Sequence, residues 1–177
     1  DILKSIIKNG IMKKKNVSRT FSPSMDIQIS SNFERQIFEN LGRDSFKLSE
    51  IFNSFNKTGE YTFDKNVIEE FQNTYDASSV NDDETLKTIK KVYELYGYLV
   101  DPHTATGLKI LLDKNQDEIW ISLACAHPAK FADVVTRATN FETEIPLELS
   151  KIFDKKEKMT ILPNNTNSVK KFILENI

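Results

Sequence analysis

One short segment of the chain combines two reactive side chains. Residues 123–131 read LACAHPAKF and contain Cys125, the only cysteine, and His127, one of two histidines. A thiol two residues from an imidazole could act as a nucleophile with its base, a pair that also requires an orienting group and an oxyanion site. The two side chains could instead contribute to a zinc site, although zinc takes three or four ligands. Composition alone favours a third interpretation, a small buried cysteine at a strand end beside a turn histidine.

The second histidine, His103, lies in a turn of the same kind. The apolar segment 98–100 leads into 101–104 (DPHT), and the apolar segment 119–124 leads into 125–128 (CAHP), so each histidine is next to a proline. In an open α/β sheet, ligands bind beyond the carboxyl ends of the strands, where the chain turns into the next helix. The two turns therefore predict a binding site, and helix capping with packing is the simpler alternative.

The elements that must position these turns alternate between helix and strand. Helices are expected at 81–97, 101–114, 127–139 and 167–177, and strands at 98–100, 118–126 and 158–162. The segment 118–126 (EIWISLACA) is the strongest strand candidate, because it is apolar and partly β-branched. This alternation predicts an α/β fold with a parallel sheet.

The first half of the chain is predominantly helical in pattern. Asp1 and Gly10 are suitable caps for a helix between them. Ser31 and Glu34 have the spacing of a capping box. Further helices are expected to begin at Asp44 or Ser45 and at Asp64, and to end before Gly59 and at about Tyr75. The stretch 31–75 is therefore predicted to be a helical layer, inserted into the α/β domain or appended to it.

The composition excludes several classes of protein. A chain of 177 residues with 39% hydrophobic and 28% charged residues is typical of one ordinary globular domain or two small ones. The net charge of −2 gives no basic footprint for nucleic acid. No apolar stretch approaches the ~20 residues of a bilayer span. A single cysteine fits a reducing compartment, so a cytoplasmic location is expected.

The glycines and the first residue lead us to expect a longer protein with a segment upstream of Asp1. The five glycines form neither of the glycine-rich patterns that bind phosphate. A loop for the phosphate of a cofactor would therefore lie upstream. Asp1 already caps a predicted helix with no lead-in before it, which suggests a fragment of a longer protein.

Three strings of the sequence are recognisable when taken together. They are TFSPSMDIQISSNFER (20–35), GYLVDPHTATG (97–107) and LACAHPAKFADVV (123–135). They closely resemble threonine synthases, in the longer form found in bacteria and fungi, and follow the family's order along almost the whole chain. The resemblance implies an α/β fold of the tryptophan-synthase-β-like class (PLP fold type II). It also implies a lyase of threonine biosynthesis, which uses pyridoxal 5′-phosphate (PLP) to convert O-phospho-homoserine and water to threonine and phosphate.

The same resemblance implies that residues 1–177 are the C-terminal portion of the catalytic domain, with the helical layer at about 31–75 added to it. The family's Schiff-base lysine and its glycine-rich phosphate loop belong to the missing N-terminal half, which would be this chain's partner. No catalytic residue is then expected in this chain, and the chain alone is predicted to be inactive. Neither nucleic acid nor a membrane is expected as a partner, and no metal is expected.

The resemblance carries five residues over to the cofactor site. At position 125 the family usually has Thr or Ser, whose hydroxyl lies against the pyridine nitrogen, and Cys125 is a weaker donor and acceptor there. Asp101, His103 and Thr104 match the DPHTA turn and are expected beside the cofactor ring, and His127 belongs to the second motif. The alternatives are a degenerate domain that binds a partner without catalysis, and a paralogue that acts on another amino-acid phosphate.

Overall fold

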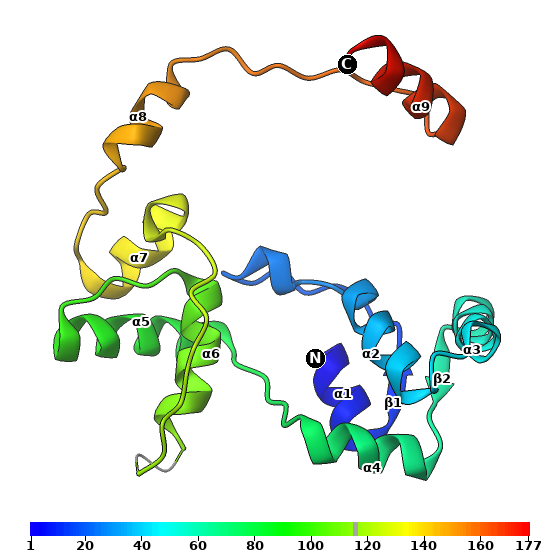
Figure 1. Ribbon diagram of the computed structural model, residues 1–177. Coiled ribbons are helices and arrows are strands. Elements are labelled where there is room, and N and C mark those ends of the chain that lie inside the picture. Colours follow the sequence, from blue (N-terminus) through cyan, green and yellow to red (C-terminus); the bar gives the residue numbers. More distant parts are fainter. Residues whose placement is uncertain (115–116) are drawn as a thin grey trace. The chain divides into compact units, whose positions relative to one another are not determined.

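The computed structural model describes residues 1–114 and 117–177, which form two compact units, Asp1–Thr143 and Glu144–Ile177. Figure 1 shows the helices and strands in chain order. The α-helices are α1 (Ile2–Asn9), α2 (Glu34–Asn40), α3 (Ser45–Thr58), α4 (Lys65–Thr74), α5 (Asp82–Tyr96), α6 (Pro102–Leu112), α7 (Ala132–Thr139), α8 (Leu147–Phe153) and α9 (Thr166–Glu175). Two strands, β1 (Ile11–Lys13) and β2 (Glu60–Thr62), pair antiparallel with Met12 opposite Tyr61.

The helices predicted from caps and periodicity are confirmed. Helix α5 has a capping box in which the Asn81 side chain accepts from the Glu84 N–H while the Glu84 carboxylate accepts from the Asn81 N–H. Helix α1 ends at Gly10, which has a left-handed φ of 68°. A Cβ at this position would also lie 2.1 Å from Cδ1 of Ile68, so both the backbone conformation and the packing require glycine.

One apolar core joins α1, the two strands and helices α2–α4. Its members include Ile6, Ile37, Phe55 and Phe71, all nearly inaccessible to solvent, and the Phe63 and Phe71 rings meet edge to face with centroids 5.5 Å apart. Helices α2–α4 occupy the range where the added helical layer is expected. In the structure they share their core with α1 and β1, which precede that range.

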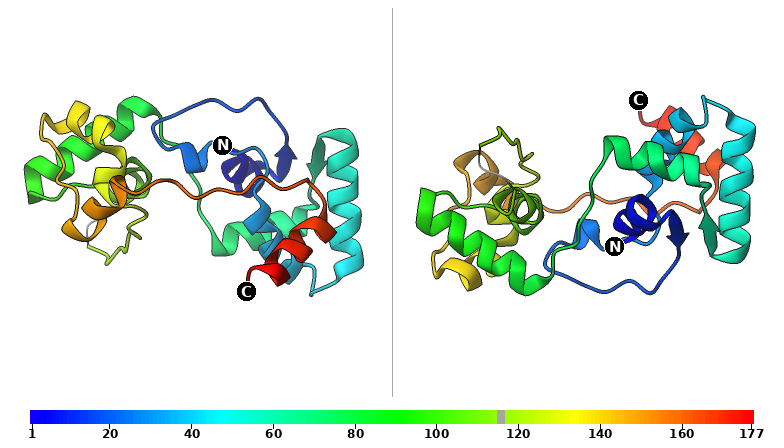
Figure 2. Two further views of the ribbon diagram at one scale, coloured as in Figure 1. Left: turned by 90° about the horizontal axis from the view of Figure 1, so that it is seen from above. Right: turned by 90° about the horizontal axis from the view of Figure 1, so that it is seen from below.

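A second apolar core lies among α5, α6 and α7, which lie beside one another in Figure 2. Its buried members are Ile89 and Val92 of α5, Val100, Ala105 of α6 and Ala138 of α7. The first turn of α6 is itself buried, from Pro102 to Ala105. This core therefore fixes the start of α6, where the DPHT turn lies.

The strand predictions at 98–100, 118–126 and 158–162 are wrong for the described part of this chain, where these segments are in neither helix nor strand. The physical reason is that a strand needs a neighbour to accept and donate its backbone hydrogen bonds. Ile119, Ile121 and Leu123 are 95%, 81% and 80% exposed, so no described residue covers them. The sheet of the described residues is the antiparallel pair of β1 and β2, and the predicted parallel sheet is not formed by them.

The predicted capping box at Ser31 is also wrong. Residues Ser31–Phe33 form a 3₁₀ helix without a side-chain cap, and α2 begins one residue later, at Glu34. Glu34 instead lies in the first turn of α2, where a carboxylate interacts favourably with the helix dipole.

The second unit contains α8 and α9. Asn165 caps α9, because its side-chain oxygen accepts from the N–H groups of Asn167 and Ser168 at 3.0 and 3.2 Å. Among the described residues, no helix has the length and apolar character that crossing a bilayer requires.

Candidate functional site

The Asp101 carboxylate organises the start of α6. Its Oδ2 accepts from the His103 N–H at 3.0 Å and its Oδ1 accepts from the Thr104 N–H at 3.2 Å, so Asp101 is the N-cap. Pro102 fits the first helical position, where no N–H is needed. The DPHT sequence thus supplies local hydrogen bonds that begin this helix.

The same carboxylate joins the two predicted turns. The Ala126 N–H donates to Oδ1 of Asp101 at 3.3 Å, and the Cys125 N–H donates to Oγ1 of Thr104 at 2.9 Å. The Thr104 hydroxyl in turn donates to Oδ1 of Asp101. The structure therefore brings 101–104 and 125–126 together, as the pattern of the two turns predicts for a site.

Asp101 is fully buried and yet remains suited to the ionised state. Burial acts to raise its pKa, but the hydrogen bonds from Thr104 and His103 outweigh that effect and lower the pKa below its ordinary value. Both carboxylate oxygens are engaged, Oδ1 with Thr104 and Ala126 and Oδ2 with His103. Both oxygens of Asp101 therefore serve to hold neighbouring residues in place.

His103 is also buried, and both of its ring nitrogens have partners. Its Nδ1 lies 2.9 Å from Oδ2 of Asp101, and its Nε2 accepts from the Ser24 N–H at 3.2 Å. Since Ser24 supplies a donor, Nε2 must carry the lone pair, and the ring proton is on Nδ1, donated to Asp101. The Phe131 ring packs on the imidazole with a centroid distance of 4.7 Å.

Ser24 is the residue of this junction that no chemical pattern identified. It lies in the 3₁₀ helix Pro23–Met25 and is attached through its backbone N–H. Every non-proline residue has such a donor, so side-chain type carries no signal for this contact. Only its place in the string 20–35 relates it to the other two segments.

Cys125 and His127 lie at the surface of the same junction. Cys125 is exposed, and its Sγ is 3.7 Å from the carbonyl oxygen of Leu123. The interpretation of Cys125 as a buried packing residue is therefore wrong, because the expected strand has no neighbour to cover it. His127 is exposed, and its Nδ1 accepts from the Ala129 N–H at 3.2 Å, which leaves the proton on Nε2.

The nucleophile and zinc interpretations gain nothing from the geometry. The base nitrogen Nδ1 of His127 is used within its own turn by the Ala129 N–H. Within 1–114 and 117–177, no three histidine, cysteine, aspartate or glutamate side chains gather as a metal site would require.

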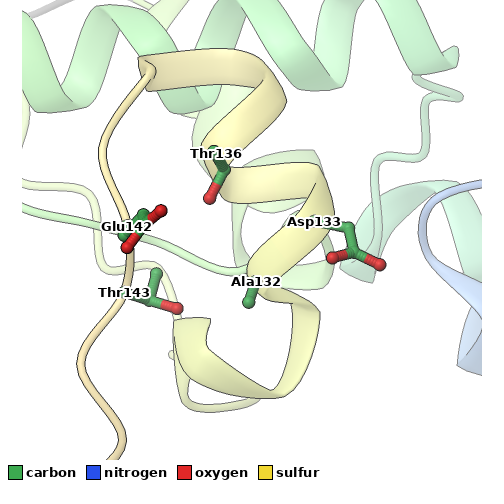
Figure 3. A pocket seen from close by; sticks show the side chains of 5 residues that line it. All are labelled: Ala132, Asp133, Thr136, Glu142 and Thr143. Carbon is green, nitrogen blue, oxygen red and sulfur yellow. The ribbon is translucent and has the colours of Figure 1, made fainter.

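A hollow of about 520 Å³ lies beside α7, and none of its lining residues belongs to this junction. Figure 3 shows its side chains, three from α7 and two from the segment that follows. They are Ala132, Asp133, Thr136, Glu142 and Thr143. None of the five residues that the sequence assigns to a site lines it, so the junction at Asp101 is the better candidate.

Comparison with known proteins connects this chain to one family. A family described as threonine synthase, C-terminal, matches residues 104–173. Threonine synthase of Pseudomonas aeruginosa is 32% identical over 176 residues, and that of Saccharomyces cerevisiae is 38% identical over 188 residues. These alignments cover 98% and 92% of this chain and 38% and 37% of the relatives, so the chain spans less than two fifths of their length.

Solved structures agree with the sequence comparison. PLP-bound threonine synthase from Brucella melitensis has a TM-score of 0.83 at 36% identity, and covers 99% of this chain with 38% of its own. Yeast threonine synthase has a TM-score of 0.81 at 34% identity, and covers 99% of this chain with 40% of its own. These matches confirm the predicted fold class, a part of the α/β fold of PLP fold type II enzymes. The sequence and the structure therefore place this chain in the threonine synthase family, as the counterpart of the C-terminal portion of its members.

Proposed function

We propose that this chain supplies the C-terminal part of a PLP-dependent threonine synthase, a lyase that converts O-phospho-homoserine and water to threonine and phosphate. The observation that carries the proposal is the junction at Asp101. It joins Ser24, the 101–104 turn and the 125–126 turn, one from each of the three family-like strings. Hydrogen bonds of this kind hold the residues of a binding site in fixed positions.

The residues at the junction suit one wall of a cofactor site. Cys125 has an exposed thiol whose contact to Leu123 is weak, so it is free to face a pyridine nitrogen. His127 presents an Nε2–H donor from the same turn. Thr104 and Asp101 hold the backbone of this turn by accepting from the Cys125 and Ala126 N–H groups, and His103 supports Asp101. When bound, PLP supplies an electron sink for proton removal and elimination.

The partner of this chain is then the N-terminal part of the same protein. Ile119, Ile121 and Leu123 expose alternate side chains along an extended segment, and Cys125 follows them directly. A segment of this kind is stabilised when its backbone pairs with a neighbouring strand. The Schiff-base lysine belongs to that partner, and this chain alone is expected to be inactive.

The direct test compares this chain with the protein expressed from its whole coding sequence. We expect the whole protein to bind PLP, with the absorbance of a lysine-bound cofactor, and to release phosphate and threonine from O-phospho-homoserine. This chain alone should do neither. Threonine formation by the chain alone would contradict the proposal. PLP binding without turnover of O-phospho-homoserine, but with turnover of another amino-acid phosphate, would replace the substrate, and no PLP binding at all would favour a non-catalytic binding domain.

The protein is further proposed to be cytoplasmic. The free and exposed Cys125 thiol supports a reducing compartment, where such a group persists. Microscopy of the whole protein with a fluorescent C-terminal fusion tests this, and accumulation in an oxidising compartment or an organelle would contradict it.

A further inference from the structure

We infer that His103 is a positioning residue whose imidazole fixes the segment Ser22–Asp26 to the start of α6, the same helix start that holds the Cys125 backbone through Thr104. The inference rests on the proposed function, since it assigns a role within that site. It concerns a loop far from α6 in sequence, which contacts α6 through the Ser24–His103 hydrogen bond and through the Thr106 hydroxyl, 3.4 Å from Sδ of Met25.

The imidazole connects two groups that require opposite hydrogen-bonding partners. Asp101 is a buried acceptor, and the Ser24 N–H is a donor. A neutral histidine with its proton on Nδ1 satisfies both, because Nδ1 donates and Nε2 accepts. Protonation would turn Nε2 into a donor that faces another donor. The two contacts thus fit the tautomer of His103 that carries its proton on Nδ1.

The loop attached in this way is internally rigid. Asp26 accepts from the Thr20 N–H at 2.8 Å and from the Thr20 hydroxyl at 2.7 Å, which closes the loop on itself. Within it, the Met25 N–H donates to the carbonyl oxygen of Ser22 at 2.8 Å. These bonds close the loop on itself, so the attachment at Ser24 also restrains its neighbours in the loop.

Two further contacts, both made by Phe21, attach the loop to α5 and α7. The Phe21 N–H donates to Asp82 Oδ1 at 3.0 Å at the start of α5, and the Phe21 ring lies 5.2 Å from the Arg137 guanidinium of α7. Both hydrogen bonds are partly buried, but the His103 side chain is itself buried, whereas Phe21 and Asp82 are half-buried and Arg137 is exposed. Loss of the imidazole acceptor should therefore release the loop more than loss of either other contact.

Hydrogen exchange in the whole protein tests the inference, because it reads the loop itself. His103→Asn keeps a short side chain that can donate toward Asp101 but does not reach Ser24. His103→Gln places a side-chain carbonyl oxygen near the position of Nε2, where it can accept from the Ser24 N–H. We expect exchange in peptides covering 20–26 to be about tenfold faster in His103→Asn. In His103→Gln it should stay within about twofold of the wild-type rate.

His127→Asn is the matched control, because His127 bonds within its own turn and should leave exchange at 20–26 unchanged. Equal exchange in the Asn and Gln variants of His103 would overturn the inference, since the acceptor would then have no role. Nitrogen NMR of the wild-type histidine rings gives a second measurement that needs no variant to fold. It should show a proton on Nδ1 of His103, and a proton on Nε2 would overturn the inference. Neither measurement depends on turnover, so both are independent of the proposed reaction.

Discussion

At the scale of single residues, Cys125 carries the sharpest expectation for the cofactor site. Its backbone N–H donates to the Thr104 hydroxyl, and its thiol is exposed to solvent. In the whole protein, Cys125→Thr should therefore bind PLP as tightly as the wild type or up to about threefold more tightly, because a hydroxyl is the better hydrogen-bonding group. Titration of the cofactor absorbance measures this.

The control for that substitution is Cys125→Val, because valine has the shape of threonine but no hydrogen-bonding group. It should weaken PLP binding about threefold to tenfold. A severe loss of PLP binding or activity in Cys125→Thr would contradict the placement of residue 125 at the cofactor.

Asp101 carries a second residue-scale prediction, about stability. Asp101→Asn would point an amide N–H₂ or a weaker acceptor at the donors of Thr104, His103 and Ala126, and should lower the free energy of unfolding by about 2–3 kcal/mol at pH 7. The exposed Asp83→Asn should lower it by at most about 0.5 kcal/mol. Urea unfolding of both variants measures the difference. Equal losses of stability would contradict the role of Asp101 as the acceptor that joins the two turns.

The lowered pKa of Asp101 fixes the sign of the pH dependence. Its folded pKa lies below the unfolded value of about 4, so its stabilising effect is present above pH 4 and is lost as the pH falls through the folded pKa. Stability measured between pH 7 and pH 3 should fall more steeply in the wild type than in Asp101→Asn. Parallel curves would show that this carboxylate is not linked to folding.

At the scale of elements, the end of α1 tests how the first core is closed. Gly10→Ala adds a Cβ to a left-handed residue and pushes it against Ile68, so it should cost about 2–4 kcal/mol of stability. Gly97→Ala at the end of α5 has the same kind of φ, 65°, but its Cβ would meet open space. It should cost about 1–2 kcal/mol, and the difference between the two is the packing contribution. Equal losses in urea unfolding would contradict a close contact with Ile68.

At the scale of the whole molecule, we expect the rest of the protein to cover the apolar segment 119–124. Ile121 is 81% exposed here, so Ile121→Glu would be harmless if nothing else covered it. In the whole protein we expect it to lower stability by at least about 2 kcal/mol, because a charge would enter a buried strand. Ile177→Glu, at a position that is 98% exposed, is the control and should change stability by less than about 0.5 kcal/mol. Equal and small effects would show that the segment 119–124 stays uncovered.

Local rules predicted the helices of this chain except α8, for which no helix was expected from the sequence. Caps such as Asn81, Asp44 and Gly10 act within four residues of the groups they satisfy, so the sequence alone determined where α5, α3 and α1 begin or end. The two polar turns were also evident from sequence, because proline, aspartate and histidine have distinct local preferences. The capping box expected at Ser31 failed, since the Glu34 N–H donates to the Ser31 carbonyl oxygen of a 3₁₀ turn instead.

Tertiary structure alone decided the strands and the junction. A strand exists only where another backbone lies beside it, and the apolar pattern of 118–126 does not reveal which one. The junction depends on the N–H groups of Ser24, Cys125 and Ala126, which are invisible in a sequence because nearly every residue has one. The sequence by itself determined which side chains could form the site. The fold decided that Asp101 and His103 are buried supports while Cys125 and His127 are exposed, because only packing determines which atoms water and ligands can reach.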